Sequence, residues 1–266
     1  MSPARPPEGA HSRLAGPRAA RRVHQCVPGR ERFDRLDALR GFAMLWMASF
    51  HFSFDLNNFR LLQPHQDFYG DPFWTLQRSC IVTLFLFCAG LGQAAALQAA
   101  QSERRFWRRW LQIAGCALLV SAGSAVMFPR SWISFGVLHG ITLMLLLTRR
   151  AAPLGAWLWP LGALAMLLPR LVQHPWFDHR WSNWVGLVTM KPITEDYVPL
   201  LPWLGVMLWG LAAGGWLLAH RPGVLAGPVP APLRPLAALG RWSLSFYMVH
   251  QPLLIGLILG WRWLRV

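Results

Sequence analysis

The chain has 266 residues, of which 54% are hydrophobic and only 14% are charged, well below the roughly 25% charged residues of an average soluble domain. Its net charge of +15 would suit a nucleic-acid partner, but the basic residues gather in the N-terminal tail and in short loops between apolar runs. That placement is typical of cytoplasmic loops and of contact with anionic lipid headgroups. Composition therefore excludes an ordinary soluble domain, and without a nucleic-acid motif we expect no nucleic-acid partner.

The N-terminal segment, residues 1–33, is rich in Arg, Pro, Ala and Gly. It has no apolar core of the kind that a signal peptide needs. We expect a disordered, basic cytoplasmic tail at 1–33 and a single transmembrane domain at 34–266.

Seven apolar runs follow the tail, most of them near the roughly 20 residues that a helix needs to cross the hydrocarbon layer of a bilayer. They lack the alternation that marks the strands of a membrane barrel. The predicted fold is all-α, a polytopic bundle of about seven transmembrane helices. The expected spans are 38–57, 79–98, 110–128, 132–148, 153–170, 199–219 and 242–261.

The arginines predict the orientation of this bundle. With the N-terminus in the cytoplasm, the inner loops are richer in arginine than the outer loops, as the positive-inside rule requires. We therefore expect the N-terminus inside and the C-terminus outside, in the inner membrane of a bacterium. The loops at 58–77 and 171–198 would then be periplasmic, and loops this long are often functional. The Pro-rich stretch 222–235 is predicted to be a cytoplasmic linker.

The first span carries four ionisable residues on one stripe. At about 100° per residue, Asp37, Arg40, His51 and Asp55 fall within about 60° of one another. His51 is 11 positions beyond Arg40, about 16 Å along a helix, which places its imidazole close to mid-membrane. Ionisable groups at that depth usually face a bundle interior or a water-filled cavity. The stripe therefore predicts a functional site, and a polar pair that only locks helix packing is the alternative.

The last span repeats this theme. Ser243, Tyr247 and His250 lie within about 60° of one another by the same arithmetic, and Pro252 frees backbone groups that a polar site could use. His139 is another histidine inside a span. For His139 and His250, a structural hydrogen bond between helices explains the residue as well as a functional role does.

Two other patterns do not predict a ligand site. Gly90 and Gly92 lie inside an apolar run, where they indicate close helix packing rather than a phosphate-binding loop. His174, Asp178 and His179 match no established metal spacing, so we expect no metal.

Five segments in order resemble a known family. The opening residues 35–51, from Arg35-Leu-Asp-Ala-Leu-Arg-Gly to His51, are similar to the first helix of the transmembrane acyltransferase superfamily. The chain more closely resembles the catalytic-domain family of heparan-alpha-glucosaminide N-acetyltransferase, in a short bacterial form. The segments that carry the resemblance, besides the first, are 78–90, 135–141, 196–205 and 240–252.

The resemblance implies an enzyme that takes an acetyl or other acyl group from cytoplasmic acyl-CoA. The acceptor would be a glycan or another small molecule on the far side of the membrane, attacking through a hydroxyl or an amine. The arginine and histidine of the family's first-helix motif correspond to Arg40 and His51. The loop after that helix holds the active histidine proposed for the mammalian enzyme, and here it contains His65 and Tyr69. The lipid bilayer is the other expected partner, and a homodimer is left open.

Acyl transfer assigns roles to these residues. A histidine near neutral pH can remove the acceptor proton, and we predict His51 as this base, oriented by Asp55. His250 and His65 are further catalytic candidates. Guanidinium groups bind phosphate through two hydrogen bonds, so Arg40 and Arg241 are predicted to hold the donor, with Arg78 and His139 completing the set. The cluster Arg104, Arg105, Arg108 and Arg109 would bind CoA phosphates or only set the topology.

A proton-coupled transporter or flippase is the alternative function, because it would use the same intramembrane His, Asp and Arg residues. Such transporters are often built from inverted repeats with broken helices in matching positions. The sequence shows no clear repeat of this kind, and acyl transfer is therefore the favoured prediction.

Overall fold

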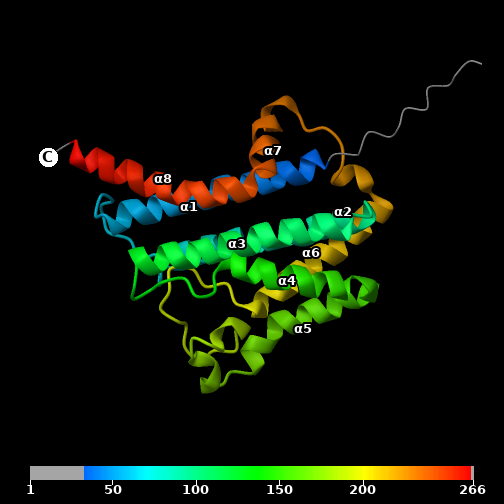
Figure 1. The fold of residues 1–266 in the computed structure, drawn as a ribbon, viewed down its shortest axis with the longest axis horizontal. Helices are drawn as coiled ribbons and strands as arrows, with labels where there is room; N and C mark the ends of the chain where they lie inside the picture. The colour runs from blue at the N-terminus through cyan, green and yellow to red at the C-terminus, as the bar shows by residue number, and fades with distance from the viewer. Residues whose placement is uncertain (1–32, 265–266) are drawn as a thin grey trace, which may run out of the picture. The chain divides into compact units, whose positions relative to one another are not determined.

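The structure is a computed structural model that describes residues 33–264, and every regular element in this range is a helix (Figure 1). Residues 1–32, where the disordered tail is predicted, lie outside the described residues. The α-helices are α1 (Asp34–Asn58), α2 (Pro72–Gln98), α3 (Glu103–Met127), α4 (Val137–Ala151), α5 (Leu158–Leu171), α6 (Leu200–His220), α7 (Arg234–Arg241) and α8 (Ser243–Trp263). Short 3-10 helices cover Ala152–Trp157, Pro175–Asp178, Asn183–Val185, Pro222–Val224 and Ala231–Leu233.

The predicted helical membrane bundle is confirmed. Five helical stretches within 33–264 are long and apolar enough to cross a membrane: α2, α3, Val137–Leu171, α6 and α8. The stretch Val137–Leu171 contains two helices, because the chain reverses near Gly155, whose φ is +55°. Figure 1 shows α5 running back from the end of α4. With α1, whose 25 residues extend about 37 Å, seven long helices correspond to the seven predicted runs.

Helix α1 is less apolar than the other long helices. The five stretches identified by composition do not include it, and it carries His51, Asp55 and Asn57 in its second half. Asp55 and Asn57 are nevertheless buried, with 3% and 6% of their surfaces exposed. The polar groups that lower the hydropathy of α1 thus face the protein, as the stripe in the sequence predicted.

Helix α7 was not predicted, because its residues follow the Pro-rich stretch. It stands steeply across the start of α1 (Figure 1). Two glycines allow this crossing: a Cβ on Gly41 would lie 1.9 Å from the Leu236 carbonyl oxygen, and one on Gly240 would lie 1.8 Å from that of Asp37. The crossing brings Arg241, the last residue of α7, beside the first turns of α1.

Close packing also joins α2 to α6. A Cβ on Gly90 would lie 2.3 Å from the Met207 carbonyl oxygen, and one on Gly210 would lie 2.4 Å from that of Phe87. The two backbones therefore touch where small residues permit it. The close packing that Gly90 predicted is confirmed.

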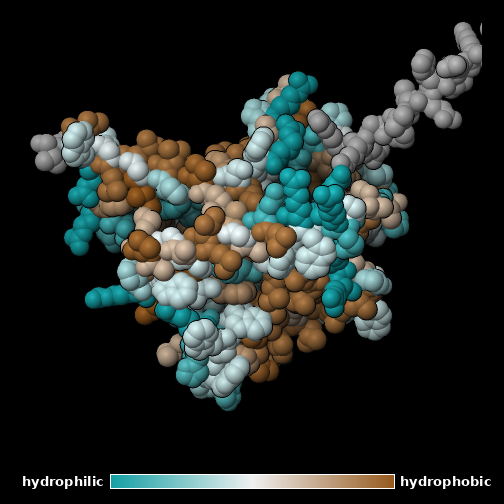
Figure 2. Space-filling view, viewed as in Figure 1, coloured by the Kyte–Doolittle hydropathy of each residue, from teal (hydrophilic) through white to brown (hydrophobic). Residues whose placement is uncertain are grey.

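Large apolar side chains cover much of the outer surface of the helices. Figure 2 shows them over α8 and over the lower face around α5. Examples are Leu118 at 68% exposure on α3, Leu164 at 54% on α5 and Leu257 at 61% on α8. Exposing such large apolar side chains to water would be costly, whereas contact with the lipid tails of a bilayer is favourable.

The bundle has two ends, which we name by their residues. At the arginine end, α1, α3 and α8 begin. Arg40 and Arg109 lie in the second turns of α1 and α3, and Arg241 lies just before α8. At the loop end, α1 and α3 finish and the long loops 59–71 and 172–199 connect the helices.

Candidate active site

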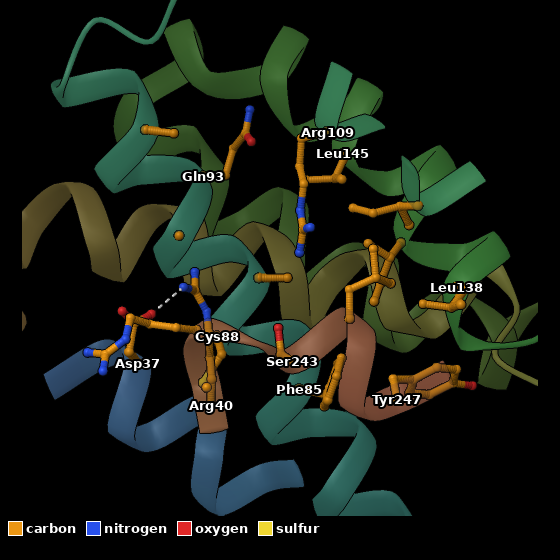
Figure 3. Close-up of a pocket in the computed structure, with 18 of the residues that line it drawn as sticks. Asp37, Arg40, Phe85, Cys88, Gln93, Arg109, Leu138, Leu145, Ser243 and Tyr247 are labelled. Atoms are coloured by element: carbon orange, nitrogen blue, oxygen red, sulfur yellow. Dashed lines mark hydrogen bonds and ion pairs between the residues drawn. The ribbon is translucent and has the colours of Figure 1, made fainter. Parts of the chain in front are cut away.

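A cavity of about 400 Å³ opens between α1, α2, α3, α4, α7 and α8 (Figure 3). Polar residues come mainly from the arginine ends of these helices: Asp37, Arg40, Gln93, Gln101, Arg109, Arg241 and Ser243. Apolar residues line the rest, including Ala43, Met44, Phe85, Cys88, Ala89, Ile113, Leu138, Ile141 and Leu244. The cavity therefore suits a ligand with a charged head and a less polar arm.

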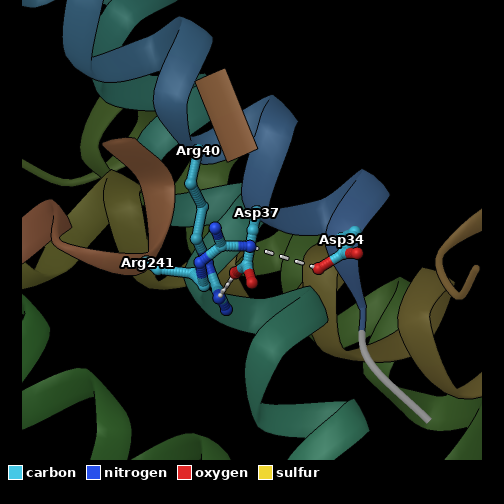
Figure 4. A network of polar contacts seen from close by, with 4 residues as sticks. All are labelled: Asp34, Asp37, Arg40 and Arg241. Atoms are coloured by element: carbon cyan, nitrogen blue, oxygen red, sulfur yellow. Dashed lines mark hydrogen bonds and ion pairs between the residues drawn. The ribbon is translucent and has the colours of Figure 1, made fainter. Parts of the chain in front are cut away.

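Arg40 reaches the cavity through a gap that a glycine provides. A Cβ on Gly92 of α2 would lie 2.0 Å from Nη2 of Arg40, so any larger residue at position 92 would displace the guanidinium. Nη1 of Arg40 donates to Oδ1 of Asp37 at 2.9 Å (Figure 4). Gly92 thus makes room for Arg40, whereas the sequence had suggested that it packs two helices together.

Arg241 completes this network from the other side. Its Nη1 lies 3.4 Å from Oδ1 of Asp34 (Figure 4), and its side chain is 45% exposed. Both Arg40 and Arg241 line the cavity. The structure therefore brings together two residues that the sequence predicted to hold the donor.

Arg109 is a third guanidinium in the cavity, and the sequence did not separate it from its neighbours. Figure 3 shows it extending from α3 into the cavity. Within residues 33–264 it has no hydrogen-bond or ion-pair partner. Arg104, Arg105 and Arg108 do not line the cavity. The spacing of Arg109 to Ile113, one helical turn, is the signal that could have assigned it to the inward face of α3.

Gln93 adds an unsatisfied donor. Its side chain is 5% exposed, and its Nε2 has no hydrogen-bond partner among the described residues. Buried polar groups are nearly always paired, and an exception indicates an unseen water or ligand. The cavity lining contains three guanidinium groups and this amide but only one carboxylate, that of Asp37. The arginine end of the cavity therefore favours binding of a polyanion.

A pair of histidines lies next to the cavity but outside its lining. Nδ1 of His51 is 2.9 Å from Nε2 of His250, and the two rings stack with centroids 5.1 Å apart. Nδ1 of His250 is 2.7 Å from the carbonyl oxygen of Tyr247. A carbonyl only accepts, so this Nδ1 carries the hydrogen. With His250 neutral, its Nε2 accepts from Nδ1 of His51, so Nε2 of His51 carries a lone pair and no hydrogen. The side chain of Gln251 lies within interaction range of His51.

Asp55 has a different partner from the one predicted. Both of its carboxylate oxygens accept from Nε2 of Gln251 at 2.9 Å, and no hydrogen bond joins Asp55 to His51 in the described part of the chain. The i, i+4 spacing would permit such a contact, but both side chains turn across to α8. The direct contact expected between Asp55 and His51 is therefore absent. His250 lies against His51 instead, and Gln251 stands between Asp55 and His51.

Aromatic rings separate the cavity from the histidine pair. Tyr247 lines the cavity, and its ring centroid is 5.7 Å from that of His250. Phe85, which also lines the cavity, has its ring centroid 6.5 Å from that of Tyr247. Tyr247 thus contacts both the cavity and His250, whereas neither His51 nor His250 lines the cavity.

Three of the predicted residues lie elsewhere. His139 caps the start of α4: its Nδ1 accepts from the backbone N–H of Gly136 at 3.3 Å, and its Nε2 lies 3.1 Å from Oγ of Ser121. Arg78 is in the second turn of α2, near the loop end. His65 is exposed in loop 59–71 and makes no side-chain hydrogen bond or ion pair with the described residues. None of the three lines the cavity.

These features define a multi-helix membrane protein with a charged cavity leading to an imidazole pair. Among residues 33–264, no group of three or more His, Cys, Asp or Glu side chains could hold a metal ion. The chain belongs to the family described as "Heparan-alpha-glucosaminide N-acetyltransferase, catalytic", whose sequence profile matches residues 32–252. This match confirms the family resemblance seen in the sequence, and the family implies a membrane acyltransferase. No curated protein and no solved structure matches the chain.

Proposed function

We propose that the protein transfers an acetyl or other acyl group from acyl-CoA to a glycan or another small acceptor, with His51 as the general base. One observation carries this proposal: guanidinium groups in excess line one end of a cavity whose other end adjoins the His51–His250 pair. A donor that carries several phosphates at one end and a thioester at the other matches this arrangement.

The arginine end supplies the donor-binding groups. Arg40, Arg109 and Arg241 would hold the phosphates of CoA, because guanidinium groups bind phosphate oxygens through paired, charge-assisted hydrogen bonds. The apolar lining beyond them suits the thioester arm. The helical rise from Arg40 to His51 is about 16 Å, so an extended arm is needed to connect the two regions.

The histidine pair supplies the proton transfer. Nε2 of His51 takes the proton from the acceptor hydroxyl or amine as its oxygen or nitrogen attacks the thioester carbonyl. The new acyl bond forms, the C–S bond breaks, and the CoA sulfur leaves as a thiolate that the His51 imidazolium protonates. Tyr247, which lines the cavity and packs 5.7 Å from His250, would then lie between the thioester and the histidine pair.

The predicted topology completes the proposal. With the N-terminus in the cytoplasm of a bacterial cell, the arginine end faces the compartment that contains acyl-CoA. The acceptor would then approach the histidine pair from the loop end. With acyl-CoA entering from the cytoplasm and the acceptor from the loop end, the acyl group would be transferred across the inner membrane.

Acyl-CoA binding to the purified protein in detergent tests the proposal. Calorimetry with acetyl-CoA and a longer acyl-CoA should show binding by the wild type and weaker binding by Arg40→Ala, with Arg108→Ala as the matched control outside the cavity. His51→Ala should still bind the donor but should not transfer its acyl group. A folded wild-type protein that binds no acyl-CoA would contradict the proposal and favour proton-coupled transport, which proton-flux assays would then test.

A further inference from the structure

Two side-chain contacts join α1 to α8 within about one helical turn (Figure 1). On α1, His51 precedes Asp55 by about one turn. On α8, their partners are the adjacent residues His250 and Gln251. The ring nitrogens of the histidines are 2.9 Å apart, and Nε2 of Gln251 is 2.9 Å from each carboxylate oxygen of Asp55. Gln251 is therefore held beside the histidine pair by its neighbour in the chain and by Asp55 on the facing helix.

The carboxylate of Asp55 determines which way the Gln251 amide faces. An ionised carboxylate only accepts hydrogen bonds, so it must meet the donor end of the amide, Nε2. Asp55 is 3% exposed, and this contact with both of its oxygens holds the amide in one orientation. The acceptor end, Oε1, consequently points away from Asp55.

Oε1 of Gln251 is a buried acceptor that has no hydrogen-bond donor within residues 33–264. Buried polar atoms are nearly always paired, so an exception requires an explanation. The Gln251 side chain lies within interaction range of His51. Neutral His51 carries its hydrogen on Nδ1, where His250 accepts it, and has only a lone pair on Nε2. Two acceptors cannot bond to each other, which explains why Oε1 lacks a donor while His51 is neutral.

We propose that Gln251 is a positioning residue that stabilises His51 after it has taken the proton of the acceptor. The incoming proton adds an N–H at Nε2 of His51, and Oε1 of Gln251 accepts a hydrogen bond from it. Asp55 holds the amide in place and supplies the negative charge behind it. Such a preoriented dipole favours the charged imidazole over the neutral one. The inference rests on the proposed function, since the acceptor supplies the proton and the CoA thiolate later removes it.

The other groups around His51 do not supply this charge. His250 acts on His51 from α8, and it is neutral when its Nε2 accepts a hydrogen bond. Loop 59–71 and α2 contribute Phe68 and Trp74, whose rings pack against Phe50, the neighbour of His51. Among these groups, Asp55 alone brings a negative charge, and it acts through Gln251.

Protonation of His51 can be measured without turnover, by NMR of protein with isotope-labelled histidine rings in detergent and without acyl-CoA. His51→Ala identifies the signals of this ring. At the pH where half of wild-type His51 is protonated, we expect Gln251→Leu to lower that fraction to about a tenth or less, because a hydrogen bond to a charged group is lost. Gln77→Leu is the matched control: this amide accepts from Nε1 of Trp46 on α1 at 3.0 Å, and its loss should leave His51 unchanged.

Exchanging the two side chains separates this role from simple fastening of the helices. Asp55→Asn should also lower the protonated fraction of His51, because it removes the charge and frees the amide to turn over. Asp55→Asn combined with Gln251→Glu restores a pair of carboxylate and amide, with the charge now next to His51. The protonated fraction should therefore return to the wild-type value or exceed it. A pair that only fastens α1 to α8 would regain stability in this variant without any change at His51.

A protonated fraction in Gln251→Leu equal to that of Gln77→Leu would overturn the proposal. If Gln251→Leu does not fold, the exchange variant decides, and a fraction as low as in Asp55→Asn overturns it. Kinetics give a second measure: Gln251→Leu should lower kcat by about 10- to 100-fold with an unchanged Kd for acyl-CoA, whereas a raised Kd with unchanged kcat would place Gln251 in donor binding instead. Failure of the proposed function would appear separately, as a wild-type protein that binds no acyl-CoA, because the histidine measurement needs no donor.

Discussion

His51 and His250 are separated by 199 positions in the chain, yet Nδ1 of the first lies 2.9 Å from Nε2 of the second. The contact joins α1 to α8. The contact also depends on the tautomer of His250. The Tyr247 carbonyl accepts a hydrogen bond and so holds the hydrogen of neutral His250 on Nδ1, which makes Nε2 of His250 the acceptor of the hydrogen bond from His51. Under the proposed mechanism, His250 would therefore position His51.

Replacing His51, the proposed base, should remove most of the activity. General base catalysis contributes about 10²- to 10⁴-fold to a rate, so we expect His51→Ala to lower kcat by that factor while acyl-CoA binding stays close to wild type. His250→Ala should lower kcat less, because Nε2 of His51 remains but loses its fixed tautomer. Steady-state kinetics with an acceptor identified by mass spectrometry would measure both.

The control for the base is His65→Ala. His65 is exposed and does not line the cavity, so this variant should retain wild-type kcat. Undiminished activity in His51→Ala together with a large loss in His65→Ala would transfer the catalytic role to the loop, as the family resemblance first suggested.

The donor site should depend on the shape of its cations as well as on their charge. Arg40→Lys keeps the charge but loses the planar fork, and Arg109→Gln removes a charge that has no internal partner. We expect each to raise the Kd for acyl-CoA by about 10- to 100-fold, since a hydrogen bond to a charged group contributes about 1.5–3 kcal/mol. Binding measured at two salt concentrations would show a smaller salt dependence for Arg109→Gln. A Kd unchanged from that of the Arg108→Gln control would exclude Arg109 from the donor site.

Sequence patterns predicted the parts of the site that follow helical periodicity. The stripe Arg40–His51 on the first span and the stripe Ser243–His250 on the last both face the bundle interior, because spacing along one helix fixes which side chains share a face. The membrane bundle itself could be predicted, since span length follows from bilayer thickness.

Contacts between helices could not be predicted in this way. The sequence favoured Asp55 as the partner of His51 because both lie on one helix, whereas the actual partner, His250, lies on another. The crossing of α7 over α1 could not be predicted either, because it depends on two glycines, Gly41 and Gly240, that are far apart in the sequence. The sequence also could not distinguish Arg109, which lines the cavity, from its neighbours Arg104, Arg105 and Arg108, which do not.

A single methyl group should disturb the donor site without removing a charge. Gly92→Ala places a Cβ 2.0 Å from Nη2 of Arg40, so the guanidinium must move away from its position beside Asp37. We expect weaker acyl-CoA binding, by about tenfold, with little loss of thermal stability, because a flexible side chain can yield.

Two other glycines give the matched controls for this prediction. Gly115→Ala, where a new Cβ has no neighbour within 4 Å, should bind acyl-CoA like the wild type. Gly90→Ala meets the backbone of α6 and should lower the thermal unfolding temperature instead. If Gly92→Ala also behaves mainly as a stability defect, the view that Gly92 makes room for Arg40 is wrong.

Asp196 should make stability depend on pH. Burial raises its pKa from 3.8 to about 6, against the opposing effects of the Val137 N–H and of the charges on Arg78 and Lys191. Because the folded state holds the proton more tightly than the unfolded state, stability is greatest below the unfolded pKa and falls as pH rises through about 4 to 6. Above about pH 6, the contribution of Asp196 to the free energy of unfolding should no longer change with pH.

Asp196→Asn isolates this effect, because it keeps an oxygen that can accept from Val137 but does not titrate. Thermal unfolding in detergent from about pH 4 to pH 7 should show a wild-type unfolding temperature that declines relative to that of the variant. A constant difference between the two across this range would show that Asp196 does not titrate there.

Membrane orientation can be tested at position 180, in loop 172–199, where an exposed arginine packs its guanidinium 4.9 Å from the centroid of a Trp132 ring. In a background with Cys26, Cys80, Cys88 and Cys116 replaced by Ser, Arg180→Cys should react with a membrane-impermeant maleimide in intact cells, because the positive-inside rule places this loop outside. A cysteine at Arg104, at the arginine end, is the paired site and should react only after the membrane is opened. The reverse pattern would place the arginine end outside, away from cytoplasmic acyl-CoA, and would contradict both the topology and the proposed direction of acyl transfer.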